Sequence, residues 1–188
     1  MIPAEYREFF VASAGATGAL IGLLFVAVSV LPEQAREAAA RAEFQARSSA
    51  AMLVFSNALV ISLAALVPGV SLGWWAIASG TVVLAFVVAT GRSAVGEIRR
   101  RSNHVGWVWL VLGLLVIAGW ELYAGIQLVL SFDPGAVETL SYVVIADLMF
   151  GIARAWQLIG LRDTGLLTSL RVLVGRQGTP AQVDGERL

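Results

Sequence analysis

The sequence predicts an all-α integral membrane protein that crosses the bilayer five times. Hydrophobic residues make up 58% of the 188 residues and charged residues only 14%, whereas about a quarter of a soluble domain is charged. A helix that rises about 1.5 Å per residue needs about 20 apolar residues to cross a hydrocarbon core roughly 30 Å thick. Five apolar segments of about this length occupy most of the chain, at residues 9–31, 48–67, 72–89, 105–130 and 140–161. We therefore expect a single five-span transmembrane domain over residues 1–163.

The first span, residues 9–31, is rich in small side chains. Every residue from 12 to 19 is Gly, Ala, Ser or Thr, and Ala14, Gly18 and Gly22 recur at intervals of four. Small residues let membrane helices approach closely in a bilayer, where the hydrophobic effect does not drive helices together. The spacing predicts that this span packs against another helix, either inside the protomer or between the copies of a homo-oligomer.

The residues before the first span argue against a cleavable signal peptide. Arg7 lies between Glu5 and Glu8 instead of in a basic leader, and the apolar run is longer than a signal peptide needs. With Tyr-Arg-Glu-Phe-Phe at residues 6–10, the small-residue run resembles the first span of a group of small bacterial integral membrane proteins of uncharacterised function. The resemblance covers residues 6–31 only and implies no activity.

The second span is preceded by a sequence typical of a helix start. Pro32 suits the first helical position, and Glu37 and Arg41 are spaced to pair across one turn of an alanine-rich run. We expect a helix over residues 33–67 that extends the second span by about three turns into the cytoplasm. This extension binds a partner protein, gates the protein or only connects two spans.

The segments that follow the five spans differ in charge. Neither the turn after the second span nor the turn after the fourth contains arginine, and lysine is absent from the chain. Arginines follow the first, third and fifth spans: Arg36, Arg41 and Arg47; Arg92, Arg99, Arg100 and Arg101; Arg162, Arg171, Arg176 and Arg187. Because cytoplasmic loops carry the excess of positive charge, the N-terminus is predicted to be outside and the C-terminus in the cytoplasm. The exclusive use of arginine suggests a GC-rich bacterial genome, so we expect the bacterial inner membrane.

Residues 164–188 are expected to follow the fifth span in the cytoplasm. Leu166, Leu170 and Val174 share one helical face, which predicts an amphipathic helix on the inner leaflet before a disordered tail. Five arginines are the candidates for contact with anionic lipids or with a cytoplasmic protein: Arg36, Arg41, Arg99, Arg100 and Arg101.

Three ionisable side chains interrupt the apolar spans: Glu121 in the fourth, and Asp147 and Arg154 in the fifth. Each costs about 2.5–3.5 kcal/mol on insertion, so such groups are functional candidates. The fourth and fifth spans form a hairpin around Pro134, and Glu121 and Asp147 are each 13 positions from it, so we expect them at one depth. The same count of depth adds three side chains to a mid-membrane polar layer: Asn57, Thr81 and Thr17.

The predicted polar layer has three interpretations. Two carboxylates at one depth repel each other unless a proton or a cation lies between them, so we expect at least one to have a raised pKa or to face a wet cavity. One interpretation is a path for protons or cations through the layer. The alternatives are a site for a polar small molecule or a lipid headgroup, and a neutral network that fixes the register of the helices. Arg154 either neutralises one acid or reaches toward the inner headgroups. Glu8 could form a charged ring at the pore mouth of an oligomer.

The best functional hypothesis is a homo-oligomeric cation or proton channel or transporter. The alternative is a non-enzymatic adaptor or regulator that binds a partner protein through its cytoplasmic helix. The chain has no cysteine and one histidine, His104, which excludes thiolate and two-histidine metal motifs, so we expect no metal and no cofactor. His104 with Glu97 or Asp163 lacks any catalytic signature, so we expect no enzymatic activity. Membrane lipids are expected partners, and nucleic acid is not.

Overall fold

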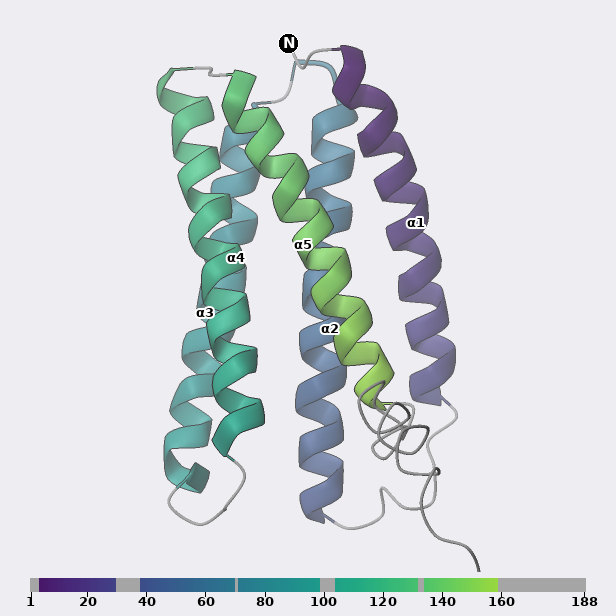
Figure 1. Ribbon diagram of the computed structural model, residues 1–188, viewed down its shortest axis with the longest axis vertical. Coiled ribbons are helices and arrows are strands. Elements are labelled where there is room, and N and C mark those ends of the chain that lie inside the picture. The colour runs from purple at the N-terminus through teal and green to yellow at the C-terminus, as the bar shows by residue number, and fades with distance from the viewer. Residues whose placement is uncertain (1–3, 30–37, 70, 99–103, 132–133, 159–188) are drawn as a thin grey trace, which may run out of the picture.

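The computed structural model describes residues 4–29, 38–69, 71–98, 104–131 and 134–158, and these residues form five long helices. The helices are α1 (Ala4–Ser29), α2 (Ala38–Leu66), α3 (Leu72–Ile98), α4 (His104–Leu130) and α5 (Pro134–Leu158) (Figure 1). Each contains a segment long and apolar enough to cross a membrane: Glu5–Ser29, Ser48–Leu66, Leu72–Arg92, Val108–Leu130 and Gly135–Trp156. The prediction of an all-helical, multi-pass membrane protein with five such helices is confirmed.

Helix boundaries differ from the predicted spans mainly where polar residues continue a helix beyond its apolar part. α2 begins at Ala38, ten residues before its apolar segment Ser48–Leu66. α5 begins at Pro134 instead of residue 140, because the fixed φ of proline suits the first helical position. Between α2 and α3 the chain reverses at Gly69, whose φ of 76° is one that side chains other than glycine rarely adopt. The predicted helix start at residues 33–37 and the predicted amphipathic helix at residues 164–188 lie outside the described residues.

The helices are arranged with α2 and α5 in the middle of the bundle (Figure 1). α1 packs on one side of this central pair, and the α3–α4 hairpin packs on the other, with α3 against α2 and α4 against α5. Within the described residues, α1 contacts neither α3 nor α4. We call the end where α1 begins and the α2–α3 and α4–α5 turns lie the upper end, as in Figure 1, and the opposite end the lower end.

Close glycine contacts hold the α3–α4 hairpin together. A Cβ atom added at Gly73 would lie 2.8 Å from the carbonyl oxygen of Gly125, and one added at Gly125 would lie 3.0 Å from the carbonyl oxygen of Gly73. The two backbones therefore touch near the upper end, as small residues permit in membrane helices. Farther along α3, a Cβ atom added at Gly80 would lie 3.1 Å from Cγ of the Leu122 side chain.

The small-residue ridge of α1 points away from the rest of the protomer. The buried face of α1 is formed by Phe10, Ser13, Thr17 and Leu24. Ala14 is half-buried, whereas Gly18 and Gly22 are exposed and have no atom within 4 Å of an added Cβ. Among the described residues nothing packs on Gly18 or Gly22, and packing of the ridge between copies stays a prediction.

Candidate functional site

The two predicted intramembrane acids lie together in the centre of the bundle and share one hydrogen-bond donor. Glu121 of α4 and Asp147 of α5 have no exposed surface, and Asn57 of α2 is 5% exposed. The Nδ2 atom of Asn57 donates to Oε2 of Glu121 and to Oδ2 of Asp147, at 2.8 Å in both cases. One amide therefore links three helices through both of its N–H groups.

A fourth side chain, which the sequence analysis missed, completes this group. The hydroxyl of Ser79 on α3 donates to Oε1 of Glu121 and shares its one hydrogen with the carbonyl oxygen of Trp75, 2.8 Å from Oγ. Gly80 next to it allows α4 to come close, since an added Cβ there would lie 3.4 Å from the carboxyl carbon of Glu121. We call Asn57, Ser79, Glu121 and Asp147 the carboxylate cluster.

Thr81 of α3 was predicted to join the polar layer because of its depth in the membrane. Its side chain lies on the opposite face of the helix from the cluster. Its side chain is exposed on the surface of the protomer, and its hydroxyl donates to the carbonyl oxygen of Ile77 at 2.7 Å. Two residues along an α-helix differ by about 200° in direction, so Ser79 and Thr81 point to opposite sides. Ser79 lies on the same side of α3 as the buried residues Ala76, Gly80 and Val83. This shared side is the signal that could have predicted Ser79.

The predicted residues of α1 also lie apart from the carboxylate cluster. Thr17 is fully buried, but its hydroxyl donates within its own helix, to the carbonyl oxygen of Ser13 at 2.6 Å. Glu8 is exposed in the upper part of α1. Neither residue has a hydrogen bond to the cluster among the contacts of the described residues.

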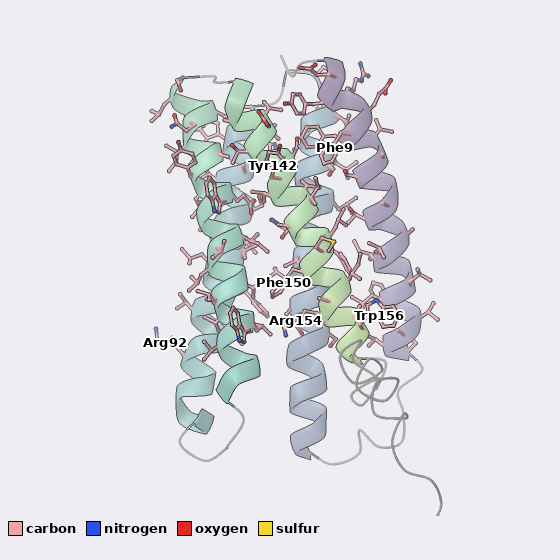
Figure 2. All side chains as sticks on the ribbon, in the orientation of Figure 1. Phe9, Arg92, Tyr142, Phe150, Arg154 and Trp156 are labelled. Carbon is pink, nitrogen blue, oxygen red and sulfur yellow. The ribbon has the colours of Figure 1, made fainter. Side chains whose placement is uncertain are left out.

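Arg154 lies below the carboxylate cluster on α5 and is 9% exposed. Its guanidinium carbon is 4.7 Å from the centroid of the Phe150 ring, within the range of a cation–π contact. Figure 2 shows Phe150 above Arg154 on α5, on the side that faces α4. Asp147, Phe150 and Arg154 are spaced by three and four positions, so they follow one face of the helix.

Apolar layers enclose the carboxylate cluster above and below. Toward the upper end the hydrophobic core consists of small and aliphatic residues together with Phe10: Ala58, Ile61, Ala64, Leu72, Ala76, Ala124, Leu128, Ala136, Val137, Leu140 and Val144. The hydroxyls of Ser62 and Ser141 are also buried toward this end. Toward the lower end a second core surrounds Val54, Val83 and Leu114, and Phe150 packs against it. The cluster is therefore a polar layer between two apolar ones.

The carboxylate cluster has fewer donor hydrogens than carboxylate oxygens that could accept them. The amide of Asn57 and the hydroxyl of Ser79 supply three hydrogens, whereas two ionised carboxylates offer four oxygens. The remaining oxygen, Oδ1 of Asp147, is buried and has no hydrogen-bond partner among the described residues. Burying two ionised carboxylates costs several kcal/mol for each ion even after relaxation. A proton on one carboxyl group would remove one of these charges.

The described residues contain no group of three or more His, Cys, Asp or Glu side chains that could hold a metal ion. Comparison of the chain with protein families, with curated proteins and with solved structures finds no match.

Several predicted contact residues cannot be placed. Arg36, Arg99, Arg100 and Arg101 lie outside the described residues, and Arg41 lies in α2 but its side chain is not described. The side chains of Glu97 and His104 are not described either, and Asp163 lies outside the described residues. The predictions that rest on them stay predictions.

Proposed function

We propose that this multi-pass membrane protein moves protons across the bilayer, with Glu121 and Asp147 as the groups that take up and release the proton. The observation that carries the proposal is the shared amide of Asn57, which holds two fully buried carboxylates from different helices on one nitrogen. Two ionisable groups buried inside spans are expensive in a bilayer and therefore argue for a functional role.

The donors around the pair favour a proton over a metal cation. The two N–H groups of Asn57 point at the carboxylates from between them, which is the position that a cation bridging both acids would need. A proton needs no such space, because it binds to a single oxygen. Oδ1 of Asp147, which lacks a donor among the described residues, is the acceptor we assign to it.

We also propose that the protein acts as a homo-oligomer in the bacterial inner membrane. The outward ridge of Ala14, Gly18 and Gly22 supports close packing with a second copy, because glycine at the two exposed positions lets a helix backbone approach. The arginine distribution supports an external N-terminus and a cytoplasmic C-terminus.

Proton flux into liposomes tests the proposal. Purified protein is reconstituted with a pH-sensitive dye inside, and the wild type is compared with Glu121→Gln and Asp147→Asn. We expect either change to abolish flux above empty liposomes, because an amide cannot carry a proton between the two sides. Glu138→Gln is the matched control, since Glu138 is an exposed acid of α5 that bonds only to the Tyr142 hydroxyl in the described contacts. Folded wild-type protein without flux, or full flux in Asp147→Asn, would overturn the proposal.

The alternative function, an adaptor that binds a partner protein, is favoured by the length of α2. This helix starts at Ala38, ten residues before its apolar segment, so it continues past the membrane-spanning part. An adaptor would keep its partner in Glu121→Gln and lose it when Arg41 and Arg47, in the part of α2 before its apolar segment, are replaced by glutamate. Co-purification from membranes that express each variant distinguishes the two functions.

A further inference from the structure

Among the described residues, buried ionisable side chains continue from the carboxylate cluster in one direction only. Apart from Glu121 and Asp147, Arg154 is the only buried ionisable side chain in the described part of the chain, and it lies toward the lower end. Toward the upper end the buried polar side chains of the described residues are the hydroxyls of Ser62 and Ser141, and the core around them is small or aliphatic. The side of Arg154 is therefore the side on which a charged group lies next to Asp147.

A single aromatic ring separates the two groups along α5. Phe150 follows Asp147 by three positions and precedes Arg154 by four. α5 runs obliquely, from beside α4 at the upper end toward α1 at the lower end (Figure 1). The Phe150 ring reaches across to α4 where the two helices diverge, and it packs against the lower core that includes Leu114 and Ala118.

The Phe150 ring packs against Gly113, a glycine of α4. A Cβ added at Gly113 would lie 2.5 Å from Cε2 of Phe150, which is closer than real Cβ contacts. Gly113 meets one edge of the ring, and the Arg154 guanidinium lies over the ring, 4.7 Å from its centroid. Such a ring can leave its place by side-chain rotation, without any movement of a helix.

We propose that the Phe150 ring, which contacts Gly113 and Arg154, is a gate that closes the carboxylate cluster toward the lower end of the bundle. Its role in proton movement rests on the proposed function, but its role as a barrier does not. When the ring swings away, water reaches Asp147 from the side of Arg154. When it returns, the ring separates the cluster from Arg154.

A cysteine in place of Ala118 reports on this barrier without any reference to proton flux. Ala118 is 1% exposed, lies three positions before Glu121 and belongs to the core on which Phe150 packs. The chain contains no native cysteine, so Ala118→Cys introduces the only thiol of the reporter protein. A small membrane-impermeant thiol reagent is applied separately to each side of membrane vesicles. A second protein with Ser102→Cys, in the segment between α3 and α4, marks the side of the lower end.

We expect the thiol of the Ala118→Cys reporter to react slowly when the gate is intact. It should react about tenfold faster when Phe150→Ala or Gly113→Ala is added, since both changes favour local opening. The faster reaction should occur only from the side that labels the Ser102→Cys protein. Proton flux should rise in the same gate variants and vanish when Glu121→Gln is added. Arg154→Gln provides a third way to loosen the ring and leaves all core residues in place, which covers the case in which Phe150→Ala does not fold.

Phe55 provides the matched control for the gate. Its ring also sits on a glycine, Gly151 of α5, but it belongs to a separate core with Leu24 and Ala51. Phe55→Leu should leave the labelling of the Ala118→Cys reporter at its original rate. An unchanged labelling rate in all three gate variants, or faster labelling from the opposite side, would overturn the gate. Faster labelling without proton flux in any protein would support the gate and overturn the proton function alone.

Discussion

Asn57 and Asp147 are 90 positions apart in the sequence, yet Nδ2 of Asn57 donates a 2.8 Å hydrogen bond to Oδ2 of Asp147. The second N–H of the same amide serves Glu121, so α2, α4 and α5 meet at one nitrogen. Because α2 and α5 are also the central helices of the bundle, the cluster fixes the rotation of both about their axes. The proposed proton site and the arrangement of the central helices therefore share the side chain of Asn57.

Replacing Asn57 by alanine should destabilise the protein, because two buried carboxylates lose their hydrogen-bond donor. Oε2 of Glu121 and Oδ2 of Asp147 would both lose their donor inside the bilayer, which we expect to lower the free energy of unfolding by about 2–4 kcal/mol. Unfolding in mixed micelles, followed by tryptophan fluorescence, measures the effect. In the Glu121→Gln and Asp147→Asn background the amide faces neutral groups, so the loss should be smaller. An equal loss in both backgrounds would show that Asn57 acts by packing alone.

Ser79 and Thr81 form a matched pair that separates the cluster from the lipid-facing surface. Ser79→Ala removes the hydroxyl that donates to Oε1 of Glu121 and should cost about 1–3 kcal/mol of stability, because a buried carboxylate oxygen is left without a donor. Thr81→Ala removes an exposed hydroxyl bonded only within its own helix and should be close to neutral. The same unfolding measurement decides, and equal effects would exclude a specific role for Ser79.

The number of helices and the pairing of Glu121 with Asp147 could be predicted from the sequence because both depend on length alone. An apolar segment of sufficient length spans a membrane, and two acids at equal distances from a hairpin turn lie at equal depth. The same count predicts Asn57. These predictions require no knowledge of which helices are neighbours.

The other members of the predicted layer could not be assigned, because depth does not give the direction of a side chain. Ser79 and Thr81 differ little in depth, but only Ser79 faces α4. Thr17 is buried on α1, which contacts neither α3 nor α4 in the described residues. Helix order and rotation follow from side-chain packing between segments distant in sequence, such as the fit of Phe55 on Gly151, and no local pattern encodes them.

Gly125→Ala should separate α3 from α4. The added Cβ would lie 3.0 Å from the carbonyl oxygen of Gly73 and 3.0 Å from Cγ1 of Ile77, and the backbone oxygen has no freedom to move aside. We expect a loss of about 1–3 kcal/mol from this overpacking. Gly119→Ala on the same helix is the control, since its Cβ meets nothing within 4 Å and should stabilise slightly through helix propensity. A neutral Gly125→Ala would mean that the hairpin packs less closely than described.

The outward ridge of α1 predicts that large residues there affect assembly without affecting the fold. Gly18→Leu and Gly22→Leu add side chains where nothing lies within 4 Å, so the stability of the protomer should be unchanged. If copies pack through this ridge, both changes should lower the oligomeric fraction, measured by native mass spectrometry of detergent-solubilised protein. Gly91→Leu, at another open glycine on α3, should leave the oligomer intact. A wild type that is monomeric throughout would contradict the proposed homo-oligomer.

Single cysteines test the orientation that the arginines predict. The chain has no native cysteine, so Ser71→Cys in the α2–α3 turn and Ser102→Cys after α3 can each be labelled alone. Ser71 lies at the upper end, which holds the arginine-free turns, and we expect a thiol there to react with an impermeant reagent in intact cells. Residue 102 follows three consecutive arginines, and a thiol there should react only after the cells are opened. The reverse pattern would place the lower end outside, and the proposed gate at Phe150 would then control access to the cluster from the exterior instead of the cytoplasm.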